Sequence, residues 1–257
     1  MNTLYKAITV LGVMLVMGGL IPSVKAQAST LQNQAVDFLS QGQDKAKRGD
    51  YLGAIADYNQ AIGVNPNLIK AYIHRGTAHH DLGDINSAIA DFNKVLRREP
   101  NNAVARYSRG EARSDVGDLP GAIADLNQAI VLAPKYAEAY NNRAVAYAMM
   151  GNLQATVADL NQVIKLNPNY VDAYYNRGKA RTALGETKGA ISDYTQAVRL
   201  KPDLAEAYGN RGILYSQLGD KKAALPDLRQ AAQLFNKQGN LGSYQQTLGF
   251  IQQIEQQ

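Results

Sequence analysis

The sequence predicts an all-α protein built from repeated pairs of antiparallel helices, and three observations carry this prediction. Proline recurs every 34 residues, at Pro66, Pro100, Pro134, Pro168 and Pro202. Glycine recurs with the same period, at Gly49, Gly83, Gly117, Gly151, Gly185 and Gly219. Between these marks the apolar positions are spaced three, four and seven residues apart, which is the period of one helix face.

Residues 171–204 illustrate how one 34-residue period predicts two helices and the ends of each. One face of a first helix carries Tyr174, Gly178 and Arg181. This helix should end at Gly185, because glycine tolerates the left-handed conformation that follows a helix. One face of a second helix carries Ala190, Tyr194, Ala197 and Val198. Pro202 then ends the second helix, because the residue before a proline is pushed out of helical space.

A helix-turn-helix period of 34 residues closed by proline resembles the tetratricopeptide repeat (TPR), here of an exported bacterial type. The resemblance implies a right-handed solenoid of antiparallel helix pairs, in which each unit buries its apolar faces against its neighbours. Six tandem units fit residues 35–238, at 35–68, 69–102, 103–136, 137–170, 171–204 and 205–238. A C-terminal capping helix is predicted at 239–257, where one face carries Leu241, Tyr244, Leu248 and Ile251.

The N-terminal segment predicts export. A short stretch with one lysine precedes the uncharged apolar run 7–21, and Val24-Lys25-Ala26 has the small residues of a signal-peptidase site. We therefore predict a signal peptide at 1–26 and a short linker at 27–34, with the periplasm or the thylakoid lumen as the destination. The alternative is an uncleaved anchor at 7–21, although this run is shorter than the ~20 residues that a bilayer span needs. Only in that case would the membrane be a partner.

Composition excludes several classes of function. The chain has no cysteine, which rules out disulfides and thiolate chemistry. Its three histidines, His74, His79 and His80, lack the i, i+4 spacing of a helical metal site. Removal of residues 1–26 would lower the formal charge from +5 to +3, too small an excess to favour nucleic acid. We predict no enzyme activity, no metal, no cofactor and no small-molecule substrate.

Two charged series with the 34-residue period predict structural ion pairs. The seventh position of the unit carries Arg75, Arg109, Arg143, Arg177 and Arg211, with Gln41 in the first unit. The twenty-third position carries Asp57, Asp91, Asp125, Asp159, Asp193 and Asp227. A partly buried guanidinium needs a carboxylate, because it cannot lose its charge. We predict that these side chains join the two helices of each unit.

The sixth position predicts a ligand site. The resemblance implies that the first helices line a concave groove, where Asn142, Asn176 and Asn210 would form a row. This row is similar to the asparagine ladder in the TPR domain of the transferase that attaches N-acetylglucosamine to proteins, where the ladder holds a polypeptide backbone. An amide group both donates and accepts hydrogen bonds, as a peptide unit does. The alternative is that asparagine is common at this position without contacting any ligand.

Neighbouring positions of the predicted groove are mixed in character. The fifth position offers Tyr107, Asn141 and Tyr175, the second offers Glu138, Asp172 and Glu206, and the ninth offers Lys179. The fifth position holds no lysine, so the terminal-carboxylate clamp of chaperone-binding TPR domains is not expected. We predict an exported scaffold that binds an extended peptide or protein partner in its groove. The alternative is an assembly factor or holdase for an envelope or photosynthetic membrane complex.

Overall fold

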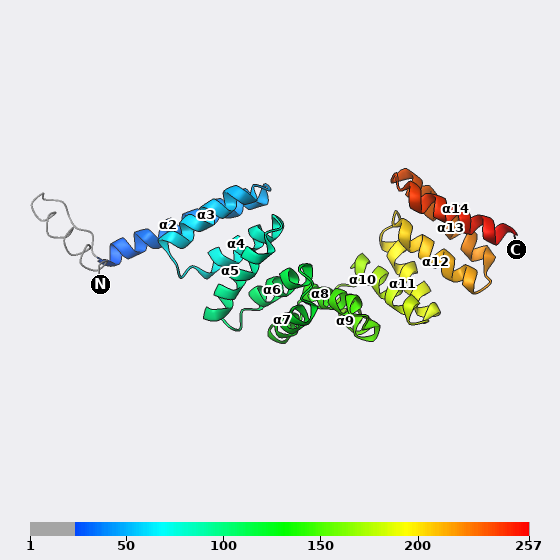
Figure 1. Cartoon of the computed structure of the whole chain (residues 1–257), viewed down its shortest axis with the longest axis horizontal. Coiled ribbons are helices and arrows are strands. Elements are labelled where there is room, and N and C mark those ends of the chain that lie inside the picture. The colour runs from blue at the N-terminus through cyan, green and yellow to red at the C-terminus, as the bar shows by residue number, and fades with distance from the viewer. Residues whose placement is uncertain (1–23, 257) are drawn as a thin grey trace, which may run out of the picture. The chain divides into compact units, whose positions relative to one another are not determined.

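The structure is a computed structural model, which describes residues 24–256 as thirteen helices with no strand in that range (Figure 1). In chain order the helices are α2 (Val24–Lys47), α3 (Tyr51–Val64), α4 (Ile69–Asp81), α5 (Ile85–Arg98), α6 (Ala103–Asp115), α7 (Leu119–Leu132), α8 (Ala137–Met149), α9 (Leu153–Leu166), α10 (Val171–Ala183), α11 (Thr187–Leu200), α12 (Ala205–Gln217), α13 (Lys221–Lys237) and α14 (Leu241–Gln256). Successive helices from α2 to α13 form the pairs of the predicted all-α repeat, and we call the two members the first and second helix of a pair. The six-unit division and its bounds stay a prediction.

The N-terminal region differs from the sequence-based expectation. Most of the signal peptide predicted at 1–26 lies outside the described residues, and only its last three residues belong to α2. The linker expected at 27–34 is helical and continues into the first helix of the first pair. The reason is local, because no glycine or proline interrupts residues 24–41. Nothing there ends the helix before the turn at Gly49.

The ends of the helices follow the predicted signals. Gly185 follows α10 with φ 76°, a left-handed conformation in which other residues are strained. The same conformation occurs at Gly49, Gly83, Gly117, Gly151, Gly219 and Gly239. Several second helices begin with a side-chain cap, as where Asp118 accepts a hydrogen bond from the Gly121 N–H at 3.0 Å. These short signals fix where each helix starts and stops.

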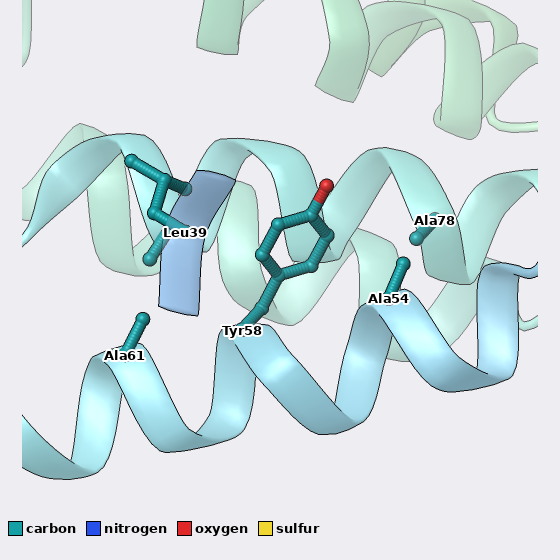
Figure 2. Packing of buried hydrophobic residues seen from close by; sticks show 6 residues of the cluster. Leu39, Ala54, Tyr58, Ala61 and Ala78 are labelled. Carbon is teal, nitrogen blue, oxygen red and sulfur yellow. The ribbon is translucent and has the colours of Figure 1, made fainter. Parts of the chain in front are cut away.

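The chain divides within α5, between Asp91 and Phe92, into two compact units. The core of the first unit forms where Tyr58 projects from α3 toward α2 and α4 (Figure 2). Ala54 and Ala61 lie beside Tyr58 on the same face of α3, opposite Leu39 and Ala78 (Figure 2). Small residues around one large ring let the three helices approach closely.

The second unit repeats this arrangement from α6 to α14. Each helix contacts the next one along the chain. The second helices α7, α9 and α11 therefore each pack between two first helices, and α13 packs between α12 and α14. The core of each pair contains one fully buried large side chain at the position equivalent to Tyr58. In this unit those side chains are Phe92, Leu126, Leu160, Tyr194 and Leu228.

The capping helix at the C-terminus is present as α14, which packs on α13. Ile251 and Ile254 are buried against Leu228, and Tyr244 is partly buried. Leu241, predicted on the buried face, is instead 63% exposed because it is the first residue of the helix. None of the helices described from Val24 to Gln256 has both the length and the apolar character of a membrane span.

Candidate functional site

The first helices from α4 to α12 each place an arginine against an aspartate of the second helix in the same pair. In the pair α8 and α9, Arg143 donates from Nε to Asp159 Oδ2 at 2.7 Å and from Nη2 to Asp159 Oδ1 at 2.5 Å. The Asp159 side chain is only 6% exposed, so both its oxygens are buried and engaged. The structure brings together all five predicted pairs, which are Arg75–Asp91, Arg109–Asp125, Arg143–Asp159, Arg177–Asp193 and Arg211–Asp227.

Each of these arginines has a further partner that the sequence reasoning missed. Arg143 Nη1 donates to Asn127 Oδ1 at 2.5 Å, and Asn127 belongs to the second helix of the preceding pair. Each guanidinium thus joins three helices. The signal was available in the sequence, because the partners recur with the 34-residue period as Asn59, Asn93, Asn127, Asn161 and Thr195.

Cations other than these arginines also reach the aspartates. Asp57 has Gln41 at the usual arginine position, and its cation is Lys45, whose Nζ lies 2.8 Å from Asp57 Oδ2. Arg181, one turn after Arg177, donates to Asp193 at 2.9 Å. These lysine and arginine contacts come from the eleventh position of the unit, for which the sequence had predicted no ion pair.

Asp125 is the most heavily paired aspartate. Arg106, Arg109 and Arg113 all lie within 3.0 Å of its carboxylate, which is 2% exposed. Burial by itself raises the pKa of Asp125, but the hydrogen bonds from Arg109 and Arg106 outweigh it, so the pKa lies below its ordinary value. The Arg and Asp series is therefore engaged within the scaffold.

The predicted asparagine row is not uniform. Asn142 donates to the Tyr107 hydroxyl at 3.2 Å and to Glu111 Oε1 at 3.3 Å, both on the preceding first helix. Asn210 lies near the hydroxyls of Tyr175 and Tyr194, where its amide opposes part of the rise in pKa that burial causes. Asn176, by contrast, makes no side-chain hydrogen bond with any residue that the structure describes. Only the middle asparagine of the row is therefore uncommitted.

A cavity of about 380 Å³ opens beside Asn176, between α8, α9 and α10. Its walls include Val145, Met149, Leu160, Asn176, Lys179 and Ala183. Leu160 is buried at the floor, whereas Val145 and Met149 are 42% and 61% exposed. An open cavity with mostly apolar walls and a few polar groups has the composition of a ligand-binding site.

Two further cavities lie along the same first helices. One of about 300 Å³ lies between α10 and α12 and shares Lys179 with the first cavity. Another, of about 190 Å³, lies between α12 and α14 and includes the predicted residues Tyr175, Glu206 and Asn210. We call this surface the groove face and define it by Val145, Met149, Asn176, Lys179, Asn210 and Ile213.

Other predicted ligand residues lie outside these cavities. Glu138 and Asp172 are exposed in the first turns of α8 and α10, where a carboxylate stabilises the positive end of the helix dipole. The Tyr107 ring packs against the Tyr136 ring with centroids 4.7 Å apart and planes tilted by 36°, and burial raises the pKa of Tyr107. Asn141 has a buried Oδ1 without a hydrogen-bond partner among the described residues. The contacts described for Glu138, Asp172 and Tyr107 are structural, whereas no polar contact is described for Asn141.

Comparison with known families agrees with the repeated geometry. A TPR repeat model matches residues 42–83, 114–151 and 178–219. Tetratricopeptide repeat models match residues 69–102, 137–170 and 205–238. The chain belongs to the tetratricopeptide repeat family. It is a TPR scaffold, a class of protein that interacts with other proteins.

Solved structures of TPR proteins resemble the chain, whereas no curated protein sequence matches it. MamA is 31% identical, with a TM-score of 0.62 over 67% of this chain and 94% of MamA. YrrB, described as a TPR protein with an unusual peptide-binding site, is 19% identical, with a TM-score of 0.62 over 69% of this chain and 91% of YrrB. PilF of Pseudomonas aeruginosa is 16% identical, with a TM-score of 0.74 over 86% of this chain and 99% of PilF. The likeness to YrrB and PilF concerns the fold alone.

The TPR groove contains a residue that the sequence reasoning missed. Met149 lines the largest of the three groove cavities and occupies the thirteenth position of its unit, where the two preceding units have Asp81 and Asp115. The signal was the apolar run from Val145 to Met150, which no acid or base interrupts. An exposed apolar side chain where the two preceding units carry an aspartate distinguishes this part of the groove.

Proposed function

We propose that this TPR scaffold holds an extended segment of a protein partner along its groove face. The single observation that carries the proposal is the open apolar cavity beside Asn176 and Lys179. Both polar groups are free of hydrogen bonds and ion pairs with described residues. Asn142 already donates a hydrogen bond to Tyr107 of the preceding pair, and the Asn210 amide lies close enough to the Tyr175 hydroxyl to affect its pKa. The segment would therefore be held by apolar contact and by the Asn176 amide, rather than by a row of three asparagines.

Site-specific photo-crosslinking in the native cells tests this proposal. A photoreactive residue at Met149, which is 61% exposed in the groove, should capture a partner protein. The matched control is Val131 of α7, which is 71% exposed and does not line the groove cavities. Capture at Val131 as strong as at Met149, or no capture at Met149, would refute the groove. Capture of many subunits of an unfinished membrane complex would favour the assembly-factor alternative.

Export is a separate part of the proposal. The lysine, the apolar run 7–21 and the small residues before Gln27 support a cleaved signal peptide, with the periplasm or the thylakoid lumen as destination. Cleavage after Ala26 would leave α2 starting at Gln27. Mass spectrometry of the protein from its native cells should find Gln27 as the first residue in the soluble fraction. An intact Met1 in the membrane fraction would instead support an anchor at 7–21.

A further inference from the structure

The cavity between α8 and α10 differs from its neighbours in its walls. In the pair α10 and α11, the Tyr194 ring lines the equivalent cavity of about 300 Å³, and its hydroxyl lies 3.2 Å from Thr182 Oγ1. The equivalent residue in the pair α8 and α9 is Leu160, which has no ring and no hydroxyl. Ala148 and Met149 then line the cavity toward solvent. The result is an open pocket with apolar walls.

Lys179 is the cation at the edge of this pocket. Its ammonium lies 5.7 Å from the centroid of the Tyr175 ring, and it forms no ion pair with any residue described between Val24 and Gln256. This differs from Arg113 and Arg181, two of the first-helix arginines that are paired with buried aspartates. Lys179 also lines the cavity on the other side of α10. A positive charge without a counterion thus lies between two apolar cavities.

Among the described residues no carboxylate forms an ion pair with Lys179, although the charge of Glu206 acts on Tyr175, whose ring lies beside the ammonium. Asp172 lies on the same helix, seven residues earlier, which at 1.5 Å per residue is about 10 Å along the axis. That rise is about one Debye length at 0.1 M salt, so salt weakens the attraction between the two charges. A carboxylate of a partner placed in the groove would meet Lys179 at close range.

We propose that the cavity between α8 and α10 anchors one large apolar side chain of the partner, and that Lys179 pairs with an Asp or Glu beside it. The cavity, at about 380 Å³, has room for a large apolar side chain such as leucine, methionine or phenylalanine. This inference rests on the proposed groove function and adds the chemistry of the segment that is bound. Burial of one such side chain changes affinity roughly 10- to 100-fold, whereas an exposed ion pair changes it about two- to fivefold.

Selection from a library of random dodecapeptides displayed on phage tests the proposal with the full chain. Peptides enriched on the parent protein should share a large apolar residue within two positions of an acid. On Lys179→Glu, which changes an exposed side chain, the acid should be replaced by Lys or Arg while the apolar residue is kept. An unchanged preference for acid on Lys179→Glu would overturn the assignment of Lys179.

Filling the cavity tests the anchor separately. Ala148→Phe should weaken an enriched peptide roughly 10- to 100-fold, whereas Ala158→Phe, at an exposed position outside the cavity, should leave its affinity unchanged. Thermal melts should show that both variants remain folded. Equal affinity for Ala148→Phe and the parent would refute the anchor, while crosslinking at Met149 would still support the groove. If no peptide is enriched and Met149 captures no partner, both proposals fail.

Discussion

The pair α8 and α9 and the pair α10 and α11 have the same helix lengths and the same turn glycines, yet their cores and their ion pairs differ. Toward the groove, Ala144 and Leu160 in the first pair replace Gly178 and Tyr194 in the second. Inside the scaffold, Asp159 receives one arginine, whereas Asp193 receives both Arg177 and Arg181. The comparison shows that one backbone arrangement accepts different cores and different degrees of charge compensation.

The largest expected effect concerns the ion pairs. Arg143→Ala leaves the buried Asp159 without a cation and should lower the free energy of unfolding by roughly 3–5 kcal/mol. Arg177→Ala should cost less, roughly 1–3 kcal/mol, because Arg181 remains 2.9 Å from Asp193. Urea unfolding measures the change in the free energy of unfolding. Hydrogen exchange shows which helices lose protection, since a repeat protein loosens locally.

The control for this pair of variants is Arg199→Ala. Arg199 is exposed and its described hydrogen bond is to Gln196 on the same helix, so the change should stay within about 0.5 kcal/mol. Equal losses for Arg143→Ala and Arg177→Ala would contradict the idea that Arg181 compensates.

An intermediate effect is expected at the helix crossing. A Cβ on Gly178 would lie 2.7 Å from Tyr194 Cε1, and the buried ring has little room to move. Gly178→Ala should therefore cost about 1–3 kcal/mol in a urea melt. Adding Tyr194→Leu gives this pair the residues of α8 and α9, and the double variant should lose less than the sum of its two single variants. If the losses of the two single variants simply add up in the double variant, the Tyr194 ring and the Cβ at position 178 do not clash.

The smallest effect separates the asparagines. Asn142→Ala removes the contacts with Tyr107 and Glu111 and should lower the free energy of unfolding by about 0.5–1.5 kcal/mol. Asn176→Ala removes no described hydrogen bond and should change stability by less than about 0.5 kcal/mol. Thermal melts of the two variants compare these values directly. A larger loss for Asn176→Ala would assign Asn176 to the scaffold rather than to the groove.

The Arg and Asp series shows why part of the scaffold was predictable. Arg and Asp lie sixteen residues apart in each pair, and a helix-turn-helix unit of fixed length brings that offset together every time. The partner Asn127 was equally periodic, but it belongs to the preceding pair, so its contact crosses between units. The helical state of residues 27–34 was missed because a linker was inferred there without any residue that ends a helix.

The sequence by itself determined the helix pairs, their turns and the ion pairs, because these depend on residues at a fixed separation within one repeat. Only the tertiary structure decided which groove residues are free. Asn142, Asn176 and Asn210 are chemically identical and equivalent in the repeat. Their neighbours on the first helix of the preceding pair nevertheless differ, and are Tyr107, Asn141 and Tyr175, respectively. A tyrosine hydroxyl reaches the asparagine of the next pair, whereas the shorter Asn141 forms no described contact with Asn176. The open cavity likewise arises where the side chains of α8, α9 and α10 meet, because its volume depends on their combined sizes.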